Sequence, residues 1–418
     1  MSRFSITQEE RVYLRELAKR QMEIANLPVM ESRKKQWFAL NTGKPAIPPV
    51  VIETWTFDPE FMPYEKVMKT TSKSAAAIEW QLLVNIRNHE LLDDDKVIPP
   101  YFEIGWNVDV KKYGFDIETF KADDPGLAYQ FKHPITDLAK DMHKIKPSEI
   151  SFDKKASLEW YDFVNDILGD IMPVVITGEP GSFNLTQNFI ILMGMENFYY
   201  AMNDDPENVH KLMQFFTDDY IRIAKIKEEN DLLTVRNSYE HIITSQLFTD
   251  ELPADGYTGK ARLKDSWVWA ESQETSGVSP GMFEEFCLPY YAKACSYMGK
   301  IYYGCCEPVH QISEMLLREI PNIGKFSISK WCDENMIGET LRNNKVVYSR
   351  KPDPTYVGIG GPVLDEDAWR DHIKKTLSAA KGCQVEFIMR DIYSCGGSLN
   401  KAKRSIDIAK EESAKHLD

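Results

Sequence analysis

The chain has 418 residues, of which 43% are hydrophobic and 27% charged, so it can bury a large core and a mainly disordered state is excluded. Its formal net charge of −14 argues against nucleic acid or an anionic membrane as a partner, because both are bound by basic surfaces. No apolar run is long enough to cross a membrane and the first residues lack a secretory leader, so we expect a cytoplasmic protein.

The first part of the chain, residues 1–155, is predicted to be a mainly helical extension that packs on the rest. Thr7 and Glu10 form a capping-box pattern before an amphipathic stretch over 11–25, which predicts a helix there. The polar residues before 155 mark the boundary of the extension. Its other predicted elements are a helix over 73–88 and short strands at 50–52 and 101–104.

From residue 156 to 418, short apolar strands alternate with amphipathic helices, which is typical of a parallel sheet covered by helices. About seven or eight such units fit a closed barrel, so the predicted fold class is α/β, a (β/α)8 TIM barrel with a helical N-terminal extension. Helices are predicted to begin after Asp205, Ser279 and Asp365. The predicted strands are 173–177, 232–236, 266–270, 300–304, 325–329, 345–349 and 384–389.

Chemistry in such a barrel lies at the C-terminal ends of the strands, and thiols follow two of them. Cys305 and Cys306 come after the strand 300–304, and Cys395 follows the last strand on the same face. Thiolate is a preferred zinc ligand, so these positions predict a zinc site. The alternative is that the adjacent cysteines are buried packing residues, the usual fate of a free cysteine.

Aromatic and acidic residues alternate after another predicted strand. These residues are Trp267, Trp269, Glu271 and Glu274. They suit a pocket in which an aromatic ring stacks on the substrate and an acid transfers a proton. The alternative is that the tryptophans fill space under neighbouring helices and Glu271 is solvated. Arg350 follows a later strand and is a candidate clamp for a carboxylate or phosphate, although a charge in a loop is more often solvated.

Several ordered motifs occur between about residues 165 and 415. They are Pro173-Val-Val-Ile-Thr-Gly-Glu-Pro-Gly-Ser-Phe-Asn, Met195-Glu-Asn-Phe, Asp204-Asp-Pro-Glu-Asn-Val-His, Ser279-Pro-Gly-Met-Phe-Glu-Glu-Phe-Cys-Leu-Pro-Tyr, the Asp353-Pro354 turn and the Cys395 segment. In this order they resemble the uroporphyrinogen decarboxylase superfamily. The N-terminal segments Glu79-Trp-Gln-Leu and Pro100-Tyr-Phe-Glu resemble a corrinoid-linked methyltransferase branch of it.

The resemblance implies a choice between two chemistries. The decarboxylases carry an arginine-rich Met-Arg-Gln-Ala-Gly-Arg-Tyr type segment, which this sequence lacks. The methyltransferases bind zinc with a His-x-Cys and a second cysteine, which match Cys305 and Cys395, while Tyr303 stands in the position of the histidine. A further ligand is then needed: we favour Glu274, and the alternatives are Glu271, Cys306, Glu307 and His310.

As a hypothesis, the resemblance implies a zinc-dependent methyltransferase that moves a methyl group between a small molecule and cobalamin on a separate corrinoid protein. An aryl methyl ether is the first-choice donor, which would make the enzyme an O-demethylase, and a methylamine or glycine-betaine-type donor is the second. A homodimer is compatible with this hypothesis. Its alternatives are a decarboxylase of a tetrapyrrole or aromatic carboxylic acid, and a non-catalytic binding protein. In the favoured scheme Glu271 and Glu274 are catalytic, and Trp267, Trp269, Tyr303 and Arg350 contact the substrate.

Overall fold

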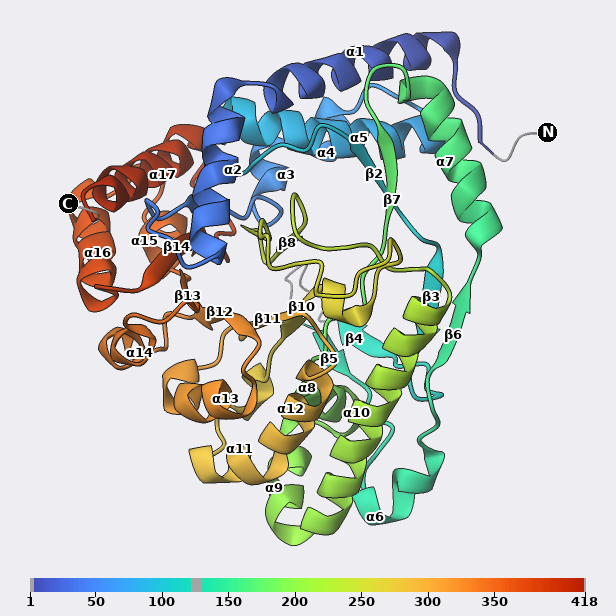
Figure 1. Ribbon diagram of the computed structural model, residues 1–418, viewed down its shortest axis with the longest axis vertical. Helices are drawn as coiled ribbons and strands as arrows, with labels where there is room; N and C mark the ends of the chain where they lie inside the picture. The colour runs from blue at the N-terminus through green and yellow to red at the C-terminus, as the bar shows by residue number, and fades with distance from the viewer. Residues whose placement is uncertain (1–3, 122–128, 417–418) are drawn as a thin grey trace.

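The computed structural model describes residues 4–121 and 129–416 (Figure 1). At its centre lies a six-stranded sheet in which every neighbouring pair of strands is parallel. This confirms the predicted α/β class with a parallel central sheet, whereas closure into an eight-stranded barrel stays a prediction. In spatial order the strands are β1 (Val50–Ile52), β14 (Gln384–Met389), β13 (Val347–Arg350), β12 (Ile323–Ile328), β11 (Lys300–Tyr303) and β10 (Trp267–Ala270).

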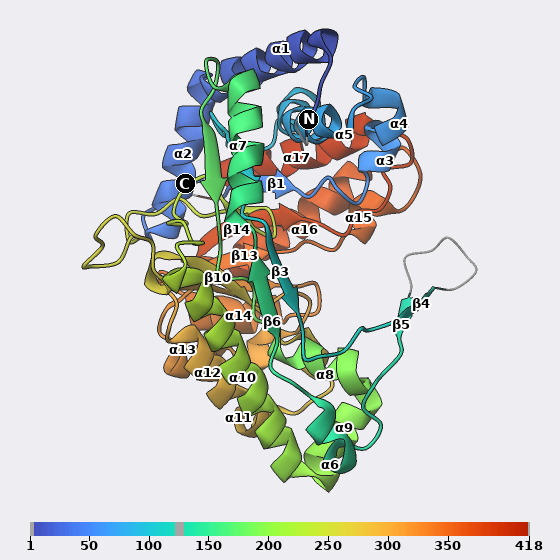
Figure 2. The same cartoon turned by 90° about the vertical axis from the view of Figure 1, so that its right-hand side faces the viewer.

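The remaining strands form separate pairs. One pair is parallel and three are antiparallel, and Figure 2 shows that β4 and β5 stand away from the rest of the molecule. Phe183, beyond the end of β7, forms a parallel bridge with Ala270 and so connects this part of the chain to the central sheet. The pairs are β2 (Phe102–Gly105) with β7 (Val174–Thr177), β3 (Val108–Lys111) with β6 (Glu149–Phe152), β4 (Thr119–Lys121) with β5 (Tyr129–Phe131), and β8 (His241–Ile242) with β9 (Ser245–Gln246).

One strand prediction is wrong: residues 232–236 do not form a strand in the structure. The backbone N–H of Thr234 donates to the carbonyl of Gly178, and that of Arg236 donates to the carbonyl of Asp265. The segment therefore bonds to two different neighbours at single points, and no continuous ladder forms along either of them.

Three of the four predicted helix starts are capped as expected. Thr7 and Glu10 make a reciprocal capping box at α1, and Ser279 and Asp365 each accept from a backbone N–H of their helix. Asp205 does not cap α10, because its carboxylate accepts from the side chain of Asn208. The longer helices are α1 (Gln8–Ala25), α2 (Pro28–Asn41), α5 (Lys73–Arg87), α7 (Lys154–Leu168), α8 (Leu185–Met193), α9 (Met195–Asp204), α10 (Pro206–Glu229), α12 (Leu288–Cys295), α14 (Glu334–Leu341), α16 (Glu366–Ala379) and α17 (Leu399–Ala414). The shorter ones are α3 (Asp58–Phe61), α4 (Tyr64–Val67), α6 (Leu138–Asp141), α11 (Pro280–Phe286), α13 (Ser313–Glu319) and α15 (Thr355–Gly358).

Two large hydrophobic clusters hold these layers together. One lies between the sheet and the helices that follow its strands, and the other joins α1, α2, α5 and α7 to the sheet through Val51, Val347 and Ile388. Figure 1 shows the N-terminal helices at one end of the sheet and α8 to α13 at the other. The boundary near residue 155 stays a prediction, and β1, which precedes it, is a strand of the central sheet.

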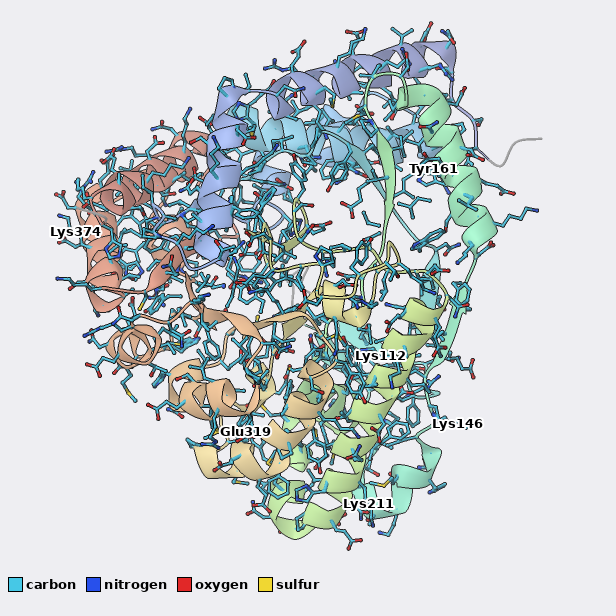
Figure 3. All side chains as sticks on the ribbon, viewed as in Figure 1. Lys112, Lys146, Tyr161, Lys211, Glu319 and Lys374 are labelled. Atoms are coloured by element: carbon cyan, nitrogen blue, oxygen red, sulfur yellow. The ribbon has the colours of Figure 1, made fainter. Side chains whose placement is uncertain are left out.

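A buried ion pair connects two strands of the central sheet. The Nζ of Lys325 on β12 lies 2.8 Å from a carboxylate oxygen of Glu386 on β14, and both side chains are fully buried. Ser245 on β9 hydrogen-bonds to both of them, so the small β8–β9 pair packs against this ion pair. Most other charges are on the surface, as Figure 3 shows for Lys211, Glu319 and Lys374. No helix of the described residues is long and apolar enough to span a membrane.

Candidate functional site

The candidate site lies at the C-terminal ends of β10 and β11, where the sequence predicts it. Glu271 directly follows β10, and Cys305 and Cys306 follow β11 after a single glycine. We call the group formed by Glu271, Glu274, Cys305, Cys306 and Glu307 the thiol–carboxyl cluster. Because parallel strands end at the same edge of the sheet, their loops bring these side chains together.

Glu307 connects the two loops of the cluster. One of its carboxylate oxygens accepts from the backbone N–H of Ser272 at 2.8 Å, and the other accepts from that of Cys305 at 2.7 Å. The side chain is almost fully buried, and this burial raises the pKa of Glu307. Glu307 therefore holds the loops in place and adds a second acid beside Glu271.

Glu271 is the most perturbed acid of the site. Its side chain is fully buried, and Oε2 accepts from the backbone N–H of Gln273 at 2.9 Å. Its Oε1 has no hydrogen-bond partner in the part of the chain that the structure describes. Burial, together with the neighbouring Glu274 and Glu307, raises the pKa of Glu271 to about 9. At neutral pH Glu271 is therefore protonated and can donate a proton.

Glu274 is held differently from Glu271, although both were predicted to be catalytic. The hydroxyl of Thr186 on α8 donates to its carboxylate at 2.8 Å, and burial raises its pKa. Tyr199 on α9 donates to the backbone carbonyl of Glu274. These contacts fix Glu274 beside Glu271, where it disfavours a negative charge on its neighbour.

The two adjacent thiols differ in exposure and acidity. Their sulfur atoms are 3.7 Å apart, and Cys305 is buried whereas Cys306 is exposed. The hydrogen bond between them raises the pKa of Cys305 and lowers that of Cys306, and burial raises the pKa of Cys305 further. Nη1 of Arg390 lies 3.9 Å from the Cys305 sulfur.

Limited alkylation is therefore expected to label Cys306 before any other cysteine, because the thiolate is the reactive species and this thiol is both exposed and acidified. Treating the native protein with substoichiometric iodoacetamide at pH 8 and mapping the adducts by mass spectrometry measures the order. Cys306→Ala should remove the fast phase. Faster labelling of Cys395 or Cys305 would contradict the assignment.

Cys395 lies in a separate neighbourhood from the other two thiols. It is fully buried, its backbone N–H donates to Glu60 on α3 at 2.7 Å, and burial raises its pKa to about 11. Within residues 4–121 and 129–416, no group of three or more His, Cys, Asp or Glu side chains is arranged to hold a metal ion. The structure therefore does not assemble the predicted ligand set of Cys305, Cys395 and Glu274, and zinc stays a prediction.

The aromatic residues predicted to contact the substrate have different surroundings. Trp267 on β10 is fully buried, and the indole N–H of Trp269 donates to the carbonyl of Gly304 at 3.0 Å. Tyr303 is buried in the core: its hydroxyl is 2.8 Å from that of Ser272 and its ring packs against Tyr291. Only Trp269 among these three retains partial exposure.

Arg350 differs from its predicted role as a clamp. It is buried, and its guanidinium donates to Glu334 and to the backbone carbonyls of Ile328 and Ser329. These protein groups take up its terminal nitrogens, so the structure gives Arg350 a structural role in place of the predicted substrate contact. The next residue, Lys351, donates to the Ser349 hydroxyl at 2.8 Å, and burial lowers its pKa to about 7.

A cavity of about 750 Å³ opens at the C-terminal end of β1, and we call it the β1 cavity. The thiol–carboxyl cluster does not line it, but one arginine joins the two. Nε of Arg390 lies 3.7 Å from Glu53 in the cavity wall, and its Nη1 faces the Cys305 sulfur. The residues of the wall used below are Glu53, Trp55, Asp58, Tyr64, Trp80 and Lys96.

No family model and no curated protein matches the chain. Among solved structures, it is similar to a methyltransferase from Methanosarcina mazei, with 13% identity over 91% of this chain and 98% of that one and a TM-score of 0.47. It is also similar to a B12-independent methionine synthase from Shewanella sp. W3-18-1, with 11% identity over 74% of this chain and 77% of that one and a TM-score of 0.32. These likenesses assign neither an activity nor a ligand to this chain.

The sequence argument missed several residues of this region, for two reasons. Glu53 and Arg390 each directly follow a predicted strand, so the rule that selected Glu271 could have found them. Trp55, Tyr64 and Trp80 come from a loop and two helices, and no periodicity or spacing indicates that they share a cavity.

Proposed function

We propose that the chain is a methyltransferase with a closed (β/α)8 barrel of the uroporphyrinogen decarboxylase type, which transfers a methyl group from a small molecule to a separate corrinoid protein. The observation that supports this most is the protonated, buried Glu271 at the strand ends, with one carboxyl oxygen unpartnered in the described chain. An acid of this kind suits the release of a heteroatom from a methyl group. The motifs that resemble the corrinoid-linked branch point in the same direction.

In this mechanism the bond between the methyl carbon and its heteroatom breaks and the heteroatom keeps the bonding electron pair, so the oxygen of an ether donor becomes an anion. Glu271 neutralises that charge by donating its proton to the heteroatom, so the demethylated product leaves as a neutral species. Burial, with Glu274 and Glu307 beside it, raises the pKa of Glu271 and so keeps it protonated until this step. A reduced corrinoid on the partner protein would supply the nucleophile that takes the methyl group.

Zinc is a separate part of the proposal, and no step above depends on it. Cys305 and Cys395 are the expected ligands, yet Cys395 is now held beside Glu60, so binding would require its segment to move. Metal analysis of Cys305→Ser and Cys395→Ser, purified without chelator, tests the pair. If zinc content is unchanged in Cys395→Ser, Cys395 is not a ligand.

The charge of the β1 cavity favours methyl transfer over the alternative, decarboxylation of a tetrapyrrole. A polycarboxylate substrate needs several cationic groups in its pocket. The side chains of the cavity wall instead include three carboxylates, Glu53, Asp58 and Glu65, and a single lysine, Lys96.

The direct test mixes the purified chain with a reduced corrinoid protein, or free cob(I)alamin as a simpler probe, and a panel of methylated donors. We expect methylcobalamin absorbance to appear with one class of donor and no turnover without a corrinoid. Tightly bound cobalamin in the isolated chain, or full activity without any corrinoid, would contradict the need for a separate carrier. Release of carbon dioxide without methyl transfer would support the decarboxylase instead.

A further inference from the structure

We infer that Glu60 on α3 is a positioning residue, which holds the loop that carries Cys395 away from Cys305 and releases it when α3 moves. The loop covers residues 390–398, between β14 and α17, and we call it the Cys395 loop. This deepens the proposed function, on which it rests only for a shared role of the two thiols. Glu60 thereby explains why a thiol that the sequence places beside Cys305 is held elsewhere in the structure.

One carboxylate connects the Cys395 loop to α3. The carboxylate of Glu60 accepts from the backbone N–H of Cys395 at 2.7 Å and from that of Gly397. The hydroxyl of Ser394 also donates to it, at 3.3 Å. Hydrogen bonds to a charged acceptor are roughly twice as strong as neutral ones, so a single side chain makes a large contribution to the position of this loop.

Two consecutive glycines give the loop a hinge. Gly396 and Gly397 both have positive φ angles, of 65° and 73°, which glycine adopts without a steric penalty. They directly follow Cys395, and α17 begins two residues after Gly397. A backbone rotation at the glycines therefore moves the thiol while α17 stays in place.

The loop is also long enough to bring Cys395 to Cys305. It begins at Arg390, whose Nη1 lies 3.9 Å from the Cys305 sulfur. An extended chain spans at most about 17 Å over the five residues from 390 to 395, so β14 does not have to move. Chain length therefore does not keep the two thiols apart, whereas the hydrogen bonds to Glu60 do.

The helix that carries Glu60 also lines the β1 cavity. Asp58 and Pro59 on α3 are in the cavity wall, and Glu60 directly follows them. No residue of this four-residue helix is buried, while Phe57 and Met62 on either side of it are. The helix can therefore tilt between two fixed ends, and a ligand in the cavity acts on the same helix that holds the Cys395 loop.

Thiol crosslinking on the full chain tests the inference without a metal, a donor or a corrinoid. Every protein in the test carries Cys306→Ala, so that the adjacent pair of thiols cannot react. Dibromobimane, which joins two thiols, is the probe, and peptide mapping by mass spectrometry identifies the joined pair. We expect Glu60→Gln to form the Cys305–Cys395 crosslink about tenfold faster or more, because the loop loses its charged hydrogen-bond acceptor.

Two controls separate release of the loop from general loosening of the fold. Glu339→Gln makes the same chemical change at an exposed position on α14 and should leave the crosslinking rate unchanged. Cys287 and Cys295 are fully buried elsewhere in the core and should stay unlabelled in Glu60→Gln. Labelling of these two thiols together with Cys395, or Cys395 adducts that are not joined to Cys305, would overturn the inference.

Thr56→Val loosens the same loop and leaves the charge of Glu60 in place. The Thr56 hydroxyl, just before α3, donates to the carbonyl of Ile392 at 2.7 Å. Its loss should raise the crosslinking rate by about two- to tenfold, the effect of one neutral hydrogen bond. An unchanged rate in a folded Glu60→Gln contradicts the inference, and so does an unchanged rate in Thr56→Val if thermal melting shows that Glu60→Gln does not fold.

The donor panel of the proposed function tests whether the cavity acts on Glu60. A donor that the wild type demethylates should raise the crosslinking rate of Cys306→Ala, and an unchanged rate would show that α3 does not release the loop. If no donor is demethylated and Glu60→Gln still crosslinks faster, the role of Glu60 stands and the proposed function fails. If a donor is demethylated and Glu60→Gln does not crosslink faster, the proposed function stands and the role of Glu60 fails.

Discussion

Glu271→Gln is expected to lower kcat for methyl transfer by about 10²- to 10⁴-fold, the usual contribution of a general acid. The glutamine keeps the shape of the protonated carboxyl but has no transferable proton. In the wild type, activity should fall as the pH rises through about 9, where Glu271 loses its proton. Initial rates of methylcobalamin formation between pH 6 and 10 measure both effects.

Glu339→Gln on α14 is a suitable control, because it makes the same chemical change at an exposed position. The control should keep the wild-type rate and pH profile. Wild-type activity in Glu271→Gln, or an unchanged decline near pH 9 in that variant, would show that Glu271 is not the acid.

The same carboxyl affects stability in a predictable direction. The pKa of Glu271 is raised in the folded protein, so the folded state binds more protons than the unfolded state between the ordinary value of 4.5 and about 9. The free energy of unfolding should therefore be highest below pH 4.5, as far as this group is concerned, and decrease as the pH rises to 9. Urea titrations should show a smaller decrease in Glu271→Gln than in the wild type. Parallel pH dependence in the two proteins would contradict the raised pKa.

Lys325→Met is expected to lower the free energy of unfolding by about 3–5 kcal/mol, because it leaves the Glu386 carboxylate buried without its cation. The pair is fully inaccessible to solvent, so water cannot compensate for the missing charge. Chemical denaturation with a fluorescence readout measures this change. Lys374→Met, at the exposed position seen in Figure 3, should change stability by less than about 0.5 kcal/mol.

The double variant Lys325→Met/Glu386→Leu distinguishes loss of an ion pair from loss of packing. Replacing both charges with apolar groups of similar size should recover most of the stability, because no charge is then buried. If the double variant is as unstable as the sum of the two single variants, the charges are not coupled as the 2.8 Å contact indicates.

The predicted strands agree with the structure where apolar residues and turn signals coincide. The segment 384–389 is an example, because it is bounded by Gly382 on one side and by the charged Arg390 and Asp391 on the other. The segment 232–236 is also mainly apolar, yet its backbone hydrogen bonds go to Gly178 and Asp265, which the sequence does not place beside it. Composition indicates that a segment can be extended, but the pairing partner decides whether it becomes a strand.

The candidate site could be predicted only in part, because the sequence shows which residues follow a strand but not which distant segments they contact. The rule that functional residues follow parallel strands selected Glu271, and the structure places this residue beside Glu274, Cys306 and Glu307. The same rule predicted that Cys395 would join these residues. In the structure the loop after β14 instead contacts Glu60 on α3, an element of the N-terminal part. Contacts between distant segments of this kind leave no local signal in the sequence.

The pairing of β1 with β14 has a consequence for synthesis on the ribosome. Val50 and Phe387 are neighbours in the sheet, so the first strand of the described chain must wait for the last one before it gains this partner. During that interval its backbone N–H and C=O groups form an open edge to which another chain can add. Chains truncated before residue 384 should therefore aggregate more readily than chains that lack only the residues after α17.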